Sequence, residues 1–416
     1  MTDYVTEIVK LIQTEADQHS RENKITSEFI ENTHIAIEKK IRILEENIWQ
    51  VPHIDETSVK HFFATAKKHY LCVNPIKIEA SSALTKPGFE TWLTDKRDSE
   101  ISWQYLDRYL VYKKESSRSE KVLKELERSS KDILGKLGDP SSPTSFFKKG
   151  LVVGEVQSGK TENFNAVINR AIDSGYQLII ILSGIMEDLR VQTQDRVESE
   201  VIGSGSIPPK YTNTGWKGVG IARPFGQQGD SEVQQIESVT SRDIDFGSPL
   251  LKAGIALNAP KIFVCKKNVS ILKNIINGLS DLLPNEGERH TIPVLILDDE
   301  ADNASLNNEG SKGREYASKV NGHIRAILGL FDKKSYLGYT ATPFANVLQD
   351  HNDSPDQSWV VPSAGGEKRL EQVDNLFPDD FIVLLDSPTN YIGAKKIFDT
   401  LADTPKLPLA IAITDY

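Results

Sequence analysis

Apolar side chains recur at helical spacing through the first 145 residues. In four segments they fall three or four positions apart, so that each segment can present one apolar stripe to a core. This pattern predicts an α-helical N-terminal domain over residues 1–145. The stripes are formed by Val5, Ile8, Val9 and Ile12, by Ile30, Ile37, Ile41, Leu44 and Ile48, by Trp103, Leu106 and Leu110, and by Leu123, Leu126, Ile133 and Leu137.

The pattern changes after residues 138–143, Gly-Asp-Pro-Ser-Ser-Pro, which are typical of a turn. Short apolar runs then alternate with helical segments, as in a parallel sheet that carries helices on both faces. We therefore predict an α/β domain over residues 146–350. The apolar runs cover residues 151–153, 178–182, 262–264, 294–297 and 336–339.

Two polar segments, 202–232 and 349–368, interrupt this pattern, and we interpret the first as a long surface insertion. Further apolar runs at 381–385 and 407–413 predict that residues 351–416 begin another, incomplete domain. The last seven residues, Ala-Ile-Ala-Ile-Thr-Asp-Tyr, are typical of a buried strand. We therefore expect this chain to be the N-terminal part of a longer protein.

Residues 154–161, Gly-Glu-Val-Gln-Ser-Gly-Lys-Thr, match the phosphate-binding pattern G-x-x-x-x-G-K-[ST] and directly follow an apolar run. In this pattern backbone amides wrap the phosphates, the lysine reaches the β- and γ-phosphates, and the hydroxyl binds Mg²⁺. A glycine turn before a surface helix is the alternative, but the strand-then-helix context favours a nucleotide site. We predict ATP and Mg²⁺ as ligands, with contacts from Gly154, Gln157, Ser158, Gly159, Lys160 and Thr161.

A second candidate site is the acidic end of the run Val294–Leu297, which continues as Asp-Asp-Glu-Ala-Asp. An ATPase needs one carboxylate to hold Mg²⁺ and another to activate the attacking water. Side chains alternate in direction along a strand, so Asp299 and Glu300 can take these two roles. We predict that Asp299 binds the metal and that Glu300 acts on the water.

Thr340 and Thr342 lie after a later apolar run, in the sequence Tyr-Thr-Ala-Thr-Pro. Their hydroxyls could bond the acidic loop and couple nucleotide state to a neighbouring surface. An ordinary strand-to-loop turn would explain the same residues.

Four cations are candidates for a nucleic-acid contact, because they follow apolar runs where strands or helices are expected to end. The chain has a net charge of −10, so such binding has to come from a local basic surface. Solvated loops would account for these cations equally well. The candidates are Arg190, Arg196, Lys266 and Lys267.

Composition narrows the other possibilities. The chain has two cysteines, too few for a disulfide framework, and eight histidines without a metal-binding spacing. The N-terminus lacks the pattern of a signal peptide, and no apolar stretch is long enough to cross a membrane. A guanine-specific N-K-x-D motif is missing after the phosphate loop. We expect a cytoplasmic protein without zinc that uses ATP.

The order of these motifs resembles that of the superfamily two helicase-like ATPases. Residues 154–161 look like their motif I, 182–196 like motif Ia, 262–268 like the strand before motif Ib, 299–302 (Asp-Glu-Ala-Asp) like motif II, and 340–343 like motif III. More narrowly, residues 150–161, 339–347 and 376–382 resemble the Z-one domain family. Its members are bacterial and phage helicase-like ATPases that are described as endonucleases and found beside restriction or defence genes. The similarity covers residues 100–400.

The resemblance implies a RecA-like ATPase lobe that acts on DNA in a restriction or anti-phage defence system, with protein partners such as a MutL-like ATPase. It also implies that an arginine finger comes from a second lobe, so this chain alone should hydrolyse ATP slowly or not at all. Gln157 departs from the family, where a glycine is common. Two other functions stay open: a nuclease subunit whose cutting centre lies outside this chain, and a nucleotide-gated protein-interaction module that does not translocate.

Overall fold

An eight-stranded sheet forms the centre of the α/β part of the structure, a computed structural model. The strand order is β1-β10-β2-β7-β6-β3-β5-β4, and every neighbouring pair is parallel except β1 with β10. The structure describes residues 4–20, 27–73, 82–154, 159–205, 216–223, 235–247, 250, 257, 259–285, 287–302, 310–343, 359–363, 366–370, 373 and 375–385. The expected strand at 407–413 and most of the 202–232 segment lie outside these residues.

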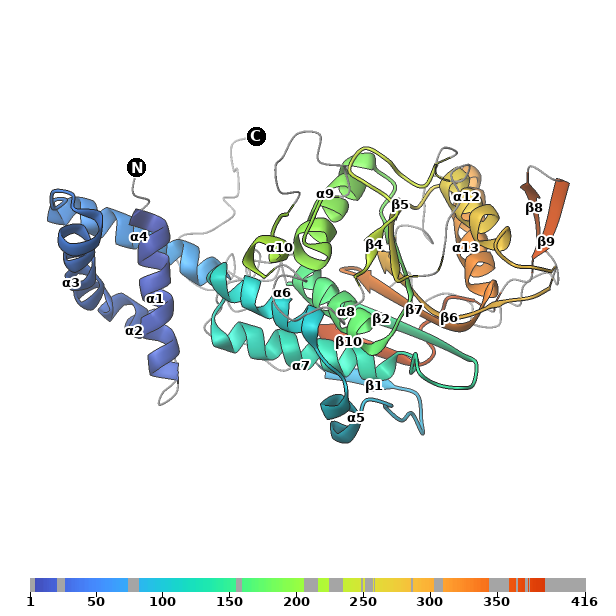
Figure 1. Ribbon diagram of the computed structural model, residues 1–416, viewed down its shortest axis with the longest axis horizontal. Helices are drawn as coiled ribbons and strands as arrows, with labels where there is room; N and C mark the ends of the chain where they lie inside the picture. The colour runs from blue at the N-terminus through green and yellow to red at the C-terminus, as the bar shows by residue number, and fades with distance from the viewer. Residues whose placement is uncertain are drawn as a thin grey trace, which may run out of the picture.

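The N-terminal helices pack against one another around a core of their own. They are α1 (Tyr4–Ser20), α2 (Ser27–Asn32), α3 (His34–Leu44), the π-helical turn η1 (Glu45–Trp49) and α4 (Glu56–Val73). Ile8, Ile12, Ile37 and Ile41 are buried in this core, as the helical spacing predicts, whereas Ile48 is exposed. Figure 1 shows these helices to one side of the sheet.

The rest of the first 145 residues packs against the sheet. β1 (Ser82–Thr85) is its edge strand, an element that the helical prediction did not include. After α5 (Asp95–Glu100), helices α6 (Gln104–Glu115) and α7 (Glu120–Lys136) contribute Tyr105, Ile133 and Leu134 to the core under the sheet. Of the predicted stripes, Ile133 and Leu137 lie in this core, whereas Leu106 and Leu126 lie in a smaller cluster with Ala166 of α8.

From residue 146 the chain alternates strands and helices. The first part holds β2 (Phe146–Gly154), α8 (Lys160–Ser174), β3 (Leu178–Ser183), α9 (Glu187–Val197), the π-helical turn η2 (Glu198–Ile202), α10 (Val219–Ala222) and β4 (Glu237–Ser238). The second part holds β5 (Lys261–Lys266), α12 (Val269–Ser280), β6 (His290–Asp299), α13 (Gly310–Gly329), β7 (Phe331–Thr340), the hairpin β8 (Trp359–Ser363) and β9 (Gly366–Leu370), and β10 (Phe381–Leu385).

Helices cover both faces of the sheet, as the apolar runs predict. On β3, Ile179 and Ile181 face the core formed with α7 and α8, whereas Leu178, Ile180 and Leu182 face α12 and α13 (Figure 1). Residues buried on both sides of a strand produce a continuous apolar run rather than an alternating one. The prediction of a mainly parallel α/β sheet is confirmed.

Strand β10 lies in this sheet, between β1 and β2. We had expected residues 381–385 to belong to another domain. They instead form a strand of the α/β sheet. Among the described helices, none combines the length and the apolar character that a membrane crossing requires.

The order of the strands sets the position of the candidate site. β2 and β6, which precede the two strongest motifs, both pair with β7 and run parallel to it. Parallel strands end at the same edge of a sheet, and α8 leaves β2 on the opposite face from α12 and α13. Ligands of open α/β sheets bind at this kind of edge, where the strand order reverses.

We predict that Gly150→Ala destabilises the protein by about 1–3 kcal/mol, because overpacking a tightly filled core has a cost of this size. A methyl group on Gly150 in β2 would overlap the buried ring of Phe381 in β10. Thermal unfolding measures the change. Gly205→Ala is the control, since the nearest atom to a methyl group there is Glu198 Oε2 at 3.9 Å. Equal melting temperatures for both variants would contradict the prediction.

Candidate functional site

The phosphate-loop motif lies between the end of β2 and the start of α8. β2 ends at Gly154 and α8 begins at Lys160. Gly159 precedes the helix in the left-handed region, with φ of 82°, a conformation that strains any residue with a β-carbon. The strand-then-helix context that the motif requires is therefore present, while residues 155–158, with Gln157 and Ser158, lie outside the described part.

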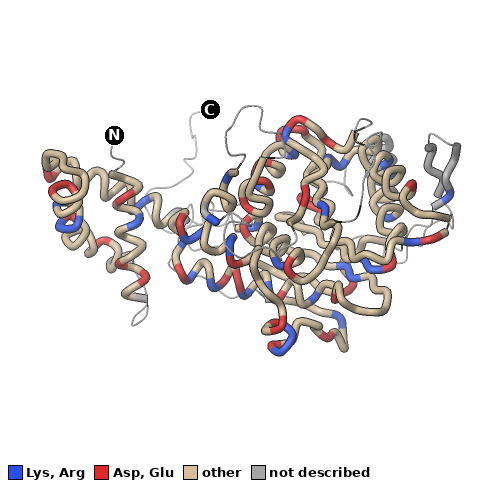
Figure 2. Tube along the Cα trace, in the orientation of Figure 1, with Lys and Arg blue, Asp and Glu red and all other residues tan. Residues whose placement is uncertain are grey.

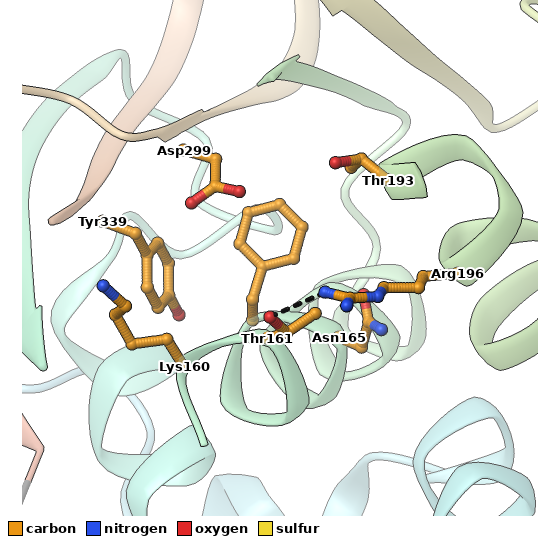
Figure 3. Close-up of a pocket in the computed structure, with 8 residues that line it drawn as sticks. Lys160, Thr161, Asn165, Thr193, Arg196, Asp299 and Tyr339 are labelled. Carbon is orange, nitrogen blue, oxygen red and sulfur yellow. Dashed lines mark hydrogen bonds between the residues drawn. The ribbon is translucent and has the colours of Figure 1, made fainter. Parts of the chain in front are cut away.

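Lys160 and Thr161 share a pocket with Asp299 from the end of β6 (Figure 3). The pocket opens to solvent and has an empty volume of about 390 Å³. It therefore brings together the lysine, the hydroxyl and the carboxylate of two motifs that are 138 residues apart in the sequence (Thr161 to Asp299). Among the described residues, the pocket is lined by Lys160, Thr161, Phe164, Asn165, Thr193, Arg196, Asp299 and Tyr339.

Burial shifts the pKa values of Lys160 and Asp299 toward their neutral forms, and neighbouring opposite charges oppose these shifts. Burial lowers the pKa of Lys160, and the charges of Asp299, Asp302 and Glu300 oppose that shift. Burial and then the charge of Glu300 raise the pKa of Asp299, against the effect of Lys267 and Lys160. Desolvated groups of this kind gather where a ligand is bound, although structural ion pairs show similar shifts.

Glu300 begins a tight turn after β6. Its φ is 54°, in the left-handed region that non-glycine residues seldom adopt. Its carboxylate lies beside Gly184 at the end of β3, where an added β-carbon would be 3.3 Å from Glu300 Oε2. Asp299 and Glu300 therefore point to different places, and Asp299 is the one that lines the pocket. β6 ends at Asp299, so the left-handed turn at Glu300, and not strand alternation, separates the two side chains.

Lys267, which follows β5, bonds the turn formed by Asp299 and Glu300. Its ammonium donates to the carbonyl oxygens of Asp299 at 2.8 Å and Glu300 at 2.6 Å, and forms a 2.9 Å ion pair with Asp298. Tyr336 of β7 donates its hydroxyl to the other carboxylate oxygen of Asp298, at 2.6 Å. Both members of the ion pair are about 1% exposed.

The hydroxyls of Thr340 and Thr342 both donate to the carboxylate of Asp302, the first at 2.8 Å. The amide of Thr342 also donates to the hydroxyl of Thr340. The prediction that these hydroxyls bond the acidic loop is confirmed, and the end of β7 is thereby tied to the loop that follows β6.

Three of the four cations proposed for a nucleic acid are held by carbonyl or carboxylate groups of the protein. Arg190 is fully buried and donates to the carbonyl oxygens of Ser241 and Arg242 at 2.9 and 2.6 Å. Lys267 is buried under the acidic turn, so neither of these two side chains can reach a phosphate backbone, and the prediction is wrong for both. Lys266 is half-buried and forms a 2.5 Å ion pair with Glu187.

Arg196, the fourth cation, faces the pocket. Its Nη1 donates to the hydroxyl of Thr161 at 3.0 Å (Figure 3). The local sequence does not predict that Arg196 lies beside the phosphate-loop motif, because the contact joins residues of two different helices, α9 and α8. Phe164 and Asn165 could have been found, since they lie one helical turn after Lys160 and Thr161.

The donor set of the pocket fits Mg²⁺. This ion prefers oxygen ligands and takes one or two protein groups together with water and phosphate oxygens. Thr161 offers a hydroxyl and Asp299 a carboxylate in the same pocket. A cage of three or more carboxylate, histidine or cysteine side chains, which would suit other metals, does not occur among the described residues.

Comparison with known proteins adds no assignment to this geometry. No family model matches the chain, and no curated protein sequence matches it significantly.

We predict that Lys267→Met destabilises the protein by about 3–5 kcal/mol, because it leaves the Asp298 charge buried without its cation. Denaturant unfolding measures the loss. Replacing Asp298 by asparagine in the same chain should recover part of it.

Lys266→Met is the matched control. This neighbouring lysine forms its ion pair near the surface, where such pairs contribute about 0–1 kcal/mol. If both methionine variants unfold at the same denaturant concentration, the ion pair does not hold the acidic turn.

Proposed function

We propose that this chain binds ATP with Mg²⁺ in the pocket at the carboxyl ends of β2 and β6, and that it is a RecA-like ATPase lobe. The observation that supports this most is the meeting of Lys160, Thr161 and Asp299 in one pocket. These are the residues that the two motifs assign to phosphate, metal hydroxyl and metal carboxylate. The single strand between β2 and β6 gives them a common edge.

In this proposal Lys160 neutralises the β- and γ-phosphates, and the amides at the start of α8 donate to phosphate oxygens. A bound Mg²⁺, held by Thr161 and Asp299, would neutralise charge on the transferring phosphoryl group. Glu300 lies next to Asp299 and orients or deprotonates the attacking water. Thr340 and Thr342 bond Asp302, so a change in the position of this loop on nucleotide binding is transmitted to the end of β7.

The wider role rests on the motif resemblance alone. We propose a helicase-like motor of the Z-one type that acts on DNA in a defence or restriction system and works with protein partners. A second candidate function, a nucleotide-gated interaction module, is favoured by the distribution of charged residues. Figure 2 shows acidic and basic positions interleaved along the described trace, and two of the four candidate cations are buried.

Lys160→Ala should weaken ATP binding about 10–100-fold, the value of one or two lost charge-assisted hydrogen bonds. Equilibrium titration with ATP and Mg²⁺ measures the affinity. Lys124→Ala, an exposed lysine of α7, is the control and should bind as the wild type does. The nucleotide assignment fails if Lys160→Ala binds ATP as tightly as this control.

Glu300→Gln should bind ATP normally and lose turnover about 10²–10⁴-fold, because the amide keeps the shape of the side chain and cannot take a proton. After incubation with ATP, the variant should retain ATP where the wild type retains ADP. Glu288→Gln, at an exposed position before β6, is the matched control. Retention of ADP by Glu300→Gln would show that another group acts on the water.

Duplex or single-stranded DNA should stimulate ATP hydrolysis at low salt if the chain is part of a motor. Each phosphate contact adds about −0.9 to the slope of log affinity against log salt on duplex DNA. Lys266 is half-buried and Arg196 is exposed, so these two candidates are not buried. Lys266→Ala should flatten the slope by up to about 1. Two results together would favour the interaction module. The rate of ATP hydrolysis would be the same with and without DNA, and a partner protein would bind only when ATP is present.

A further inference from the structure

Helix α9 is fixed to the sheet by two buried polar side chains. Arg190 bonds the carbonyl oxygens that follow β4, as described above. One turn later, Gln194 accepts from the hydroxyl of Thr240 at 2.9 Å and donates to its carbonyl oxygen at 3.1 Å. The hydroxyl of Thr240 in turn accepts from the amide of Val264 in β5 at 2.8 Å. The backbone of α9 is therefore held in one position relative to the pocket.

Arg196 projects from the end of this fixed helix into the pocket. Figure 3 shows Lys160 and Arg196 on opposite sides of Thr161. The carboxylate next to it in sequence, Asp195, bonds Arg242 at 2.7 Å and lies 3.8 Å from Lys217. Within the described part of the chain, Arg196 itself takes part in no ion pair. Among the described residues, the side chain of Arg196 bonds the neutral hydroxyl of Thr161, at the edge of the proposed phosphate site.

A guanidinium beside a phosphate site is best satisfied by a phosphate oxygen, because it offers several donors in one plane. Lys160 is assigned to the β- and γ-phosphates from its own side of Thr161. Arg196 lies on the other side of Thr161 (Figure 3). From there its guanidinium can contact the γ-phosphate, the terminal phosphate of a triphosphate, which a diphosphate lacks.

We propose that Arg196 binds the terminal phosphate and makes the pocket prefer a nucleoside triphosphate to a diphosphate. The inference deepens the proposed function and rests on it. It gives Arg196 a role in the pocket in place of the nucleic-acid contact that its motif suggested. The hydrogen bond to Thr161 holds the guanidinium near this position before the nucleotide arrives.

The test is equilibrium binding of ADP, ATP and a β,γ-imido analogue of ATP, each with Mg²⁺ and with a chelator. The variants are Lys160→Ala, Arg196→Ala and Arg196→Lys. Arg242→Ala is the matched control, since this exposed arginine bonds the neighbouring Asp195 and does not line the pocket. Arg196 is exposed, so its replacement should leave the melting temperature unchanged.

Arg196→Ala should weaken binding of the imido analogue about 10–100-fold and binding of ADP less than about 3-fold. Arg196→Lys should recover part of the loss, because it restores the charge without the planar pair of donors. Arg242→Ala should match the wild type with every ligand. This pattern would establish a contact to the terminal phosphate.

Two results overturn the inference and are distinguishable from each other. If Lys160→Ala weakens both nucleotides while Arg196→Ala leaves the ratio of their affinities unchanged, the pocket binds nucleotide but Arg196 does not read the terminal phosphate. An equal loss for ADP and the analogue belongs to this case, since it shows that Arg196 only positions Thr161. If the wild type binds no nucleotide, the proposed function and this inference fail together.

Discussion

The buried ion pair between Lys267 and Asp298 fixes the part of the structure on which the candidate site depends. A charge buried this deeply is costly unless its partner is in place, so the pair locks the end of β5 to the end of β6. The remaining donors of Lys267 bond the carbonyl oxygens of the next two residues. The left-handed turn at Glu300 is strained, and it is these bonds that hold it.

The pocket above this ion pair holds charged groups that are partly withdrawn from water. Asp299 and Glu300 are adjacent acids, and burial raises the pKa of Asp299 while it lowers that of Lys160. Both shifts show that the charged forms lack the solvation they would have in water. A polyphosphate with a hard cation would satisfy the lysine and the carboxylate together, which is the physical basis of the proposed function.

Polar contacts tie the first turn of α8 to the helices beside it. Glu162, the residue after Thr161, bonds Arg118 at 2.9 Å and Lys113 at 3.3 Å, and Lys113 also bonds Glu200 at 2.8 Å. A second chain of bonds joins the pocket residue Tyr339 to Asn163 of α8 at 2.9 Å and Asn163 to Ser129 of α7 at 2.9 Å. A shift of α8 on nucleotide binding would therefore displace side chains of α6 and α7.

The sequence determined the elements and the local chemistry of this protein. Apolar runs at residues 178–182 and 294–297 predicted buried parallel strands because burial on both faces removes alternation, and the spacing of the two motifs marked Lys160, Thr161 and Asp299. The sequence also predicted that Asp299 and Glu300 point to different places, although the left-handed turn at Glu300, rather than strand alternation, separates them. Only the tertiary structure decided which cations were exposed. Lys266 and Lys267 are adjacent and identical in type, yet one lies near the surface and the other is buried under the acidic turn. Arg190 and Arg196 diverge in the same way, since six residues along a helix turn a side chain to a different neighbour. Burial and partners depend on strand order, which brings residues together that are far apart in the chain, and no local pattern records that order.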